Sequence, residues 1–264
     1  MIKYMLNITS LANPRFKAML KLKSARQRRL LGLILIEGRR EIQRAVTAGW
    51  RLTDLFVTPQ WAKVDSWKQL PVAQTYQLTP ELMTKLSVKE HPDGLVAVAA
   101  RRDFKLDDLK LSRRPLIIIL EKVEKPGNLG AILRTAAAAG VDAIITNDQQ
   151  TDLYNPNVLR ASLGHIFTVP TVSANFDNTV AWLKKNNITG LAAAVPATAN
   201  YTDCDLTQPT AIILGAEDTG LSEAWLKAAD QLIKIPMRPT ADSLNVSVAA
   251  AIIVYEAVRQ RLKS

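Results

Sequence analysis

The chain has 264 residues, of which 48% are hydrophobic, with a formal net charge of +10 and one cysteine. This length is sufficient for one or two domains with hydrophobic cores. A single cysteine excludes an internal disulfide, two histidines form no metal-ligand cluster, and no apolar run is long enough to span a bilayer. Because the N-terminus also lacks a secretory signal pattern, we expect a cytoplasmic protein that needs no metal and no membrane.

Positive charge is concentrated in the first part of the chain. Residues 1–115 contain 22 Lys and Arg against 10 Asp and Glu, a net charge of +12, whereas residues 116–264 contain 12 against 14, a net charge of −2. Residues 15–29 carry seven cations and no acid. Most charged runs are only solvated surface, but in a protein with a pI of 9.8 this run favours contact with phosphates. The predicted phosphate ligands within it are Arg26, Arg28 and Arg29.

A small α/β module is predicted around and after this basic run. Its expected strands and helices alternate over residues 30–36, 37–49, 52–58, 80–86 and 94–100. The polar and charged stretch 103–114 that follows is typical of a linker. We therefore expect a first domain at residues 1–105, a linker at 106–114 and a second domain at 115–264.

The second domain is predicted to begin with a parallel strand–helix–strand unit. Strand-like residues 115–120 lead through a turn into an alanine-rich helix that ends at Gly140, and a β-branched run follows at 141–146. Asn128 is placed at the expected N-cap of the helix and Arg134 lies within it. The glycines of the turn lack the G-x-G-x-x-G spacing of a dinucleotide site, so by themselves they are weak evidence.

Two later loops combine glycine with small polar residues. After an apolar strand that begins at Thr210, a loop contains Gly215 and Glu217 and ends at Ser222, a suitable helix cap. After a second strand at 231–235, a loop of Pro, Asp, Ser and Asn leads into a helix that is apolar on nearly every side. Such a helix is expected to be buried or held against a partner. The loop before it can cradle a ligand, although Asn245 alone could simply cap the helix.

Taken as strings, these segments resemble the SPOUT RNA methyltransferases of the TrmH type. The similarity lies in N-L-G-A-I-L-R-T-A-A-A-A-G (128–140), G-A-E-D-T-G-L-S (215–222) and I-P-M followed by S-L-N-V-S-V-A (235–249). Residues 155–170, which contain R-A-S-L-G, are similar to a further segment of the family. The first module resembles, less specifically, the substrate-binding domain that often precedes the catalytic domain and is similar to ribosomal proteins that bind kinked RNA.

The resemblance implies an α/β protein with a C-terminal knotted SPOUT domain built on a parallel sheet, preceded by a smaller α/β RNA-binding domain. It implies a homodimer that uses S-adenosylmethionine to methylate a ribose 2′-hydroxyl in RNA. The basic first module looks more like that of ribosomal RNA methyltransferases, including the thiostrepton-resistance type, than that of tRNA enzymes. The alternatives are a tRNA ribose methyltransferase and a non-catalytic RNA-binding protein of the same fold. A Rossmann methyltransferase is disfavoured, because its glycine-rich loop and acidic strand end are not evident.

Site residues are carried over from the motif positions. Arg134 is the implied catalytic residue. Since a guanidinium has a pKa above about 12 and makes a poor base, binding a phosphate bidentately to fix the ribose is the easier role. Arg160 is implied as a further RNA ligand. The other implied catalytic residues are Asn128, Glu217, Ser243 and Asn245, and the implied cofactor-binding residues are Leu214, Gly215, Ile235, Met237, Leu244 and Asn245.

The chain departs from the family pattern in two places. His165 occupies a position that usually holds a small residue, and we favour a hydrogen-bonded histidine over an adaptation to the substrate. Arg238-Pro239-Thr240 replaces a common glycine after the I-P-M triplet, which affects the expected shape of that loop but not the cofactor assignment.

Overall fold

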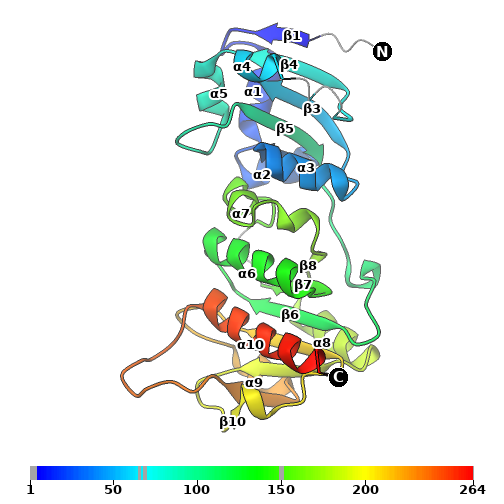
Figure 1. Ribbon diagram of the computed structural model, residues 1–264, viewed down its shortest axis with the longest axis vertical. Helices are drawn as coiled ribbons and strands as arrows, with labels where there is room; N and C mark the ends of the chain where they lie inside the picture. The colour runs from blue at the N-terminus through cyan, green and yellow to red at the C-terminus, as the bar shows by residue number, and fades with distance from the viewer. Residues whose placement is uncertain (1–4, 65–66, 68–69, 149–151, 264) are drawn as a thin grey trace. The chain divides into compact units, whose positions relative to one another are not determined.

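The computed structural model describes residues 5–64, 67, 70–148 and 152–263 (Figure 1). Two compact units are present: unit 1 comprises residues up to Arg102 together with 152–168, and unit 2 comprises 103–151 with 169–264. The segment 152–168 was expected within the second domain, but it packs with unit 1. Trp50 explains this in part, because its ring packs edge-on against Tyr154 and Phe167, with centroids 5.7 and 5.0 Å away.

Unit 1 is built on a mixed five-stranded sheet with the strand order β1-β4-β3-β5-β2. Only β5 runs antiparallel to its neighbours, β2 and β3. Its strands are β1 (Met5–Ile8), β2 (Leu33–Glu37), β3 (Leu52–Val57), β4 (Gln74–Leu78) and β5 (Leu95–Ala100). Its helices are α1 (Pro14–Lys21), α2 (Ala25–Leu31), α3 (Arg39–Thr47), α4 (Pro59–Ala62), α5 (Pro80–Leu86) and α7 (Pro156–Ala161), with the 3-10 turn η3 (His165–Phe167).

The predicted elements of the first module are present with shifted boundaries. The short helix at 80–86 is confirmed as α5. The strand expected at 30–36 starts later, at Leu33, because Leu30 and Leu31 end α2 and Gly32 closes that helix in the left-handed conformation (φ 60°). The sequence did not predict β1, α1, α2 or β4.

Unit 2 contains a fully parallel seven-stranded sheet with the order β10-β12-β9-β11-β6-β7-β8. Its strands are β6 (Leu116–Glu121), β7 (Ala143–Asn147), β8 (Thr171–Ser173), β9 (Thr189–Ala193), β10 (Ala199–Asn200), β11 (Thr210–Leu214) and β12 (Gln231–Lys234). Its helices are α6 (Pro126–Ala139), α8 (Phe176–Lys185), α9 (Glu223–Ala228) and α10 (Val246–Arg261), with the 3-10 turns η2 (Leu106–Asp108) and η4 (Tyr201–Asp203). The predicted strand–helix–strand unit is confirmed as β6-α6-β7, and the prediction of a parallel α/β fold is confirmed with it.

Helices cover both faces of the unit 2 sheet. Ile117 and Ile119 of β6 belong to a core cluster with Trp182 of α8 and Trp225 of α9. Because side chains alternate along a strand, the residues between them point to the other face. Figure 1 shows α6 (green) and α10 (red) side by side, and α10 also contacts β11. Burial on both faces accounts for the nearly continuous apolar strands.

The apolar helix α10 begins as the sequence predicts. Asn245 caps it, because its side-chain oxygen accepts a hydrogen bond from Ser247 N at 3.0 Å. Ala250 and Ile253 are fully buried, whereas Val248 is 46% exposed and Tyr255 is 49% exposed. The helix therefore packs on unit 2 with one side and leaves an apolar strip on the other.

Within the described part of the chain, no helix is long and apolar enough to cross a membrane. The same residues contain no group of three or more His, Cys, Asp and Glu side chains placed to hold a metal ion.

Candidate active site

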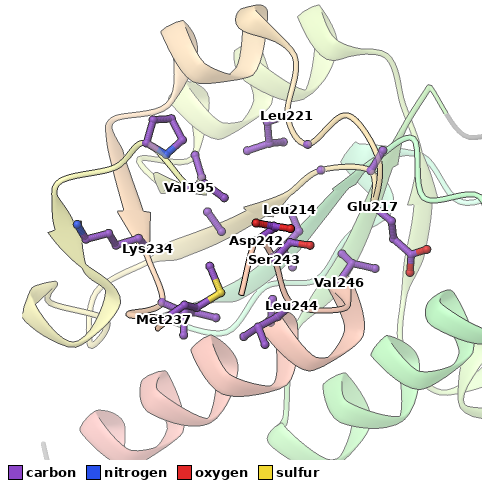
Figure 2. A pocket seen from close by; sticks show the side chains of 18 of the residues that line it. Val195, Leu214, Glu217, Leu221, Lys234, Met237, Asp242, Ser243, Leu244 and Val246 are labelled. Atoms are coloured by element: carbon purple, nitrogen blue, oxygen red, sulfur yellow. The ribbon is translucent and has the colours of Figure 1, made fainter. Parts of the chain in front are cut away.

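A pocket of about 700 Å³ lies at the carboxyl ends of three neighbouring strands of unit 2, β12, β9 and β11 (Figure 2). Its walls are the loops that follow these strands and the first turn of α10. Crevices outside the carboxyl ends of parallel strands are where open α/β sheets bind ligands, and this volume suits a small organic molecule.

The loop after β11 folds back on itself beneath this pocket. Ala216 and Gly220 exchange two backbone hydrogen bonds of 3.1 and 3.0 Å, which close the loop into a tight turn. A Cβ atom on Gly215 would overlap backbone atoms of Gly220 and Leu221. Only glycine allows this close approach, so Gly215 determines the shape of the wall.

The structure brings most of the predicted cofactor-binding residues to the pocket. Those that line it are Leu214, Gly215, Ile235, Met237 and Leu244. Figure 2 shows Met237 on the loop after β12 and Leu244 just before α10. Asn245 is not among the lining residues and instead joins the polar network described next. The Arg238-Pro239-Thr240 departure forms a turn in which Ala241 N donates to Arg238 O at 2.9 Å.

A polar network connects three loops next to the pocket. Asn128 donates to Oε1 of Glu217 through its side-chain amide. Asn245 donates to the same carboxylate oxygen at 2.9 Å and to the Asn128 side-chain oxygen at 3.2 Å. Lys125 forms an ion pair with Oε2 of Glu217. The carboxylate therefore joins the start of α6, the loop after β11 and the cap of α10.

The prediction that Asn128 caps its helix is wrong. The helix starts three residues earlier than predicted, with Lys125 as N-cap and Pro126 in its first position, so Asn128 lies inside the first turn. Proline is favoured there because its fixed φ suits a helix and it lacks the N–H that would go unpaired. Because it does not cap the helix, the Asn128 side chain is available to donate its hydrogen bond to Glu217.

Lys125 is a site residue that the sequence analysis missed. The hydrogen bond and charge of Glu217 raise the pKa of its ammonium group above the ordinary value. No local pattern identifies this lysine, because its carboxylate partner lies 92 residues further along the chain. The loop after β9, which contributes Val195 and Pro196 to the pocket, was missed as well. That strand, T-G-L-A-A, contains glycine and two alanines with Thr189 as its one β-branched residue, and it gave no strand signal.

The remaining predicted catalytic residues occupy different places. Ser243 lines the pocket from the loop that leads into α10, where Figure 2 shows it with its neighbour Asp242. Arg134 is exposed on α6 and is not a lining residue. Among the described residues, its side chain has neither a hydrogen-bond nor an ion-pair partner, which leaves the guanidinium free to bind an anion.

Three of the four arginines predicted to bind RNA are accessible in unit 1: Arg26 and Arg29 on α2 and Arg160 on α7. The prediction for Arg28 is wrong, because this residue is only 1% exposed. Its guanidinium donates twice to Asp152, at 2.8 and 2.6 Å, and also to two backbone carbonyls. A buried guanidinium with these partners stabilises the attachment of the segment 152–168 and is not available to RNA.

His165 lies in unit 1 and is half-buried. Its Nδ1 atom is 3.3 Å from the hydroxyl of Thr168. This contact agrees with the interpretation of His165 as a hydrogen-bonded histidine of the fold.

Comparison with known families agrees with this arrangement. Residues 115–255 match the SpoU rRNA Methylase family, and residues 13–97 match the MRM3-like substrate binding domain. The first match spans the sheet of unit 2, the pocket and the polar network. The second covers most of the N-terminal part of unit 1.

Individual relatives match over nearly the whole chain. The chain is 34% identical to the 23S rRNA (uridine(2479)-2′-O)-methyltransferase of Streptomyces viridochromogenes, over 95% of this chain and 91% of that protein. It is 30% identical to the 23S rRNA (guanosine(2553)-2′-O)-methyltransferase RlmP of Bacillus subtilis, over 95% of this chain and 98% of that protein. Among solved structures, the SpoU methyltransferase AviRb from Streptomyces viridochromogenes in complex with AdoMet superposes with a TM-score of 0.89 at 31% identity, covering 96% of this chain and 99% of that one.

The first two relatives are named as 23S rRNA 2′-O-methyltransferases. The AviRb structure has the same fold as this chain and contains the cofactor AdoMet, which is S-adenosylmethionine. The predictions of an enzyme, of this cofactor and of ribosomal RNA over tRNA agree with them. The chain belongs to the SpoU rRNA methylase family.

Proposed function

We propose that this protein transfers the methyl group of S-adenosylmethionine to the 2′-hydroxyl of one ribose in large-subunit ribosomal RNA. The observation that carries this proposal is that two motif loops line one pocket and the third is joined to them beside it. The β11 loop, the β12 loop and the start of α10 line it, and Asn128 of α6 is joined to it through Glu217. The functions of the relatives support the choice of ribosomal RNA.

The pocket has the chemistry that the cofactor requires. Leu214, Met237 and Leu244 supply an apolar surface for the adenine ring, and the close approach at Gly215 leaves backbone groups in place of a side chain. Asp218 and Asp242 also line the pocket and would face the positive charge of the cofactor. When bound, the cofactor supplies a methyl group on a positively charged sulfur that is ready for displacement.

The residues of the chain would act mainly by orientation. An in-line displacement requires the attacking oxygen to be aligned and water to be excluded. Glu217, held by Asn128 and Asn245, would keep the cofactor loops in a fixed relation to the start of α6. Arg134 would bind the phosphate beside the target ribose in a bidentate manner, which fixes the 2′-hydroxyl. Ser243 would complete the pocket wall.

We further propose that residues 1–105 bind substrate RNA, that 106–114 serve as a linker and that 115–264 carry the methyltransferase site. Arg26, Arg29 and Arg160 would contribute RNA contacts, since all three are exposed. The resemblance to SPOUT methyltransferases implies a trefoil knot, and we propose that it lies in the region from β11 to α10. A ribosomal RNA substrate supports a location in the cytoplasm.

The protein is also proposed to act as a homodimer that packs through α10. Val248 and Tyr255 lie seven residues apart on this helix and are about half exposed. That spacing puts them on one side, and an apolar helix side of this kind favours a two-fold contact with a second copy.

Light scattering at micromolar concentration is therefore expected to give about 58 kDa, twice the chain mass of 29.1 kDa. Val248→Glu combined with Tyr255→Glu should lower the mass toward that of a monomer, since it places charges in the apolar contact. Lys184→Glu on the exposed side of α8 is the control and should remain dimeric. A wild-type mass near that of one chain would contradict the dimer.

The experiment that tests the proposed activity maps ribose methylation of 23S ribosomal RNA with and without the gene. One methylated ribose should disappear when the gene is removed.

A further inference from the structure

Unit 1 contains a second cavity, of about 830 Å³, that is distinct from the pocket of unit 2. It is bordered by α3, by the loop before β5 and by the segment that holds α7 and η3. The described residues that line it include five cations: Arg39, Arg40, Arg44, Lys89 and Arg160. Below, this cavity is called the basic groove.

The charge of the basic groove is largely uncompensated. Its two acidic residues, Glu41 and Asp93, leave a net charge of +3 against the five cations. Asp93 forms an ion pair with Lys89, and Glu41 is only 5% exposed. Arg39, Arg40 and Arg160 are exposed, and in the described part of the chain none of their side chains has a hydrogen-bond or ion-pair partner. Three guanidinium groups are therefore free to bind anions.

Two chain segments distant in sequence are held together to form this groove. Gly164 lies so close to α3 that a Cβ atom on it would be 2.9 Å from Glu41 Cα, and its φ of +82° also favours glycine. Arg44 of α3 donates to the backbone carbonyl of Leu163. Figure 1 shows α7 near α3, and η3 packs against α3. The position of Arg160 relative to α3 is therefore set before any ligand binds.

The Arg28–Asp152 ion pair strengthens this arrangement. Arg28 is 1% exposed and binds Asp152 at the start of the segment 152–168. Breaking such a buried pair would leave an uncompensated charge in the interior. Arg28, which the sequence predicted as an RNA ligand, thus contributes to RNA binding indirectly, by attaching α7 to unit 1.

We propose that the basic groove binds the sugar–phosphate backbone of the substrate RNA, with Arg39, Arg40 and Arg160 as its phosphate ligands. This inference rests on the proposed function, in which the substrate is RNA. Planar guanidinium groups match phosphate oxygens well. Among the residues that the structure describes, the lining contains no aromatic side chain on which a base could stack, so the groove positions the RNA and does not read its sequence. The segment 152–168 lies within the methyltransferase match at residues 115–255. It therefore completes the substrate-binding surface of unit 1, most of which belongs to the match at 13–97.

The test compares two triple variants, each of which replaces three cationic side chains with glutamine and so lowers the net charge by the same amount. Arg39→Gln/Arg40→Gln/Arg160→Gln removes the free guanidinium groups of the groove. Lys17→Gln/Arg51→Gln/Lys63→Gln removes three exposed cations of unit 1 that do not line it. Binding of protein-free 23S ribosomal RNA is measured over a range of salt concentrations, with thermal unfolding and S-adenosylmethionine affinity as measures of integrity.

The groove variant should bind the RNA at least tenfold more weakly at about 0.1 M salt than either wild type or the control. The slope of log K against log salt should become shallower by about 2 to 3, since three phosphate contacts are lost and each removes about 0.7–0.9. Cofactor affinity and unfolding temperature should be unchanged. Lysines at the same three positions should restore most of the slope, because counterion release depends on charge.

Equal RNA affinity and slope in the groove variant and in wild type would overturn this proposal, as would a lysine variant that fails to restore the slope. Loss of methylation on ribosomal particles with normal binding of bare RNA would also overturn it, since the groove would then contact protein. These outcomes are separate from failure of the proposed function, which would appear as a wild-type protein that methylates no ribosomal RNA.

Discussion

Replacing Arg134 with alanine is expected to lower turnover by on the order of a hundredfold or more, about 2.7 kcal/mol of transition-state stabilisation. The side chain is exposed on α6 and forms no hydrogen bond or ion pair with the described residues. Exposed substitutions of this kind change stability little, so the folded state and the affinity for S-adenosylmethionine should be retained. Single-turnover methylation of 23S ribosomal RNA, together with cofactor calorimetry, measures both quantities.

Arg134→Lys distinguishes orientation from charge. Lysine keeps the positive charge but loses the planar fork, so a bidentate phosphate contact predicts that it fails nearly as badly as alanine. Lys184→Ala removes another exposed helical cation of unit 2 and should retain wild-type turnover. If lysine restores most of the rate, charge alone is sufficient and the orienting role is wrong. Wild-type turnover in Arg134→Ala would mean that another group fixes the ribose.

Gly215→Ala is expected to weaken S-adenosylmethionine binding by about ten- to a hundredfold, since overpacking typically costs about 1–3 kcal/mol. The added methyl group would overlap the backbone of Gly220 and Leu221, which cannot rotate away as a flexible side chain could. The loop must therefore move, and the pocket wall moves with it. Gly215→Trp, which adds a side chain large enough to fill the slot, should abolish binding.

The matched control is Gly127→Ala. This glycine lies in the first turn of α6, where a Cβ atom would meet nothing within 4 Å, and alanine favours the helix. Cofactor affinity measured by calorimetry should therefore stay at the wild-type value in the control. Unchanged affinity in Gly215→Ala would show that the donor does not bind against this loop.

The parts of the fold that the sequence predicted are those with a strong local signal. The strand-like run 115–120, the alanine-rich helix ending at Gly140 and the caps Ser222 and Asn245 each depend on a few neighbouring residues. The three motif loops were also identified from sequence. Two of them, after β11 and after β12, line the pocket, because the parallel sheet brings its strand ends together, and the third, at the start of α6, is joined to them through Glu217.

The parts that were missed depend on contacts between distant residues. Lys125 and Arg28 look alike in sequence as basic residues near helices, yet one pairs with Glu217 beside the pocket and the other is buried against Asp152. Neither partner can be inferred from local spacing. The assignment of 152–168 to unit 1 likewise depends on packing against Trp50, which lies more than a hundred residues earlier.

This packing affects how the RNA-binding role of residues 1–105 can be tested. Deleting them would remove Trp50 and Arg28, leaving Tyr154 and Phe167 without their ring contacts and Asp152 without its ion pair. A truncated chain would therefore lose structure as well as positive charge. Substitution of exposed arginines separates the two effects.

The central claim is that this protein methylates one ribose of 23S ribosomal RNA at its 2′-hydroxyl. The most direct measurement maps 2′-O-methylation across all ribosomal RNA and tRNA in cells that carry the gene, lack it or carry only Arg134→Ala. We expect one methylated ribose in 23S RNA to disappear when the gene is removed, to return with the wild-type gene and to stay absent with the variant. Identical methylation maps with and without the gene, or a lost methyl group on a base or on tRNA, would contradict the claim.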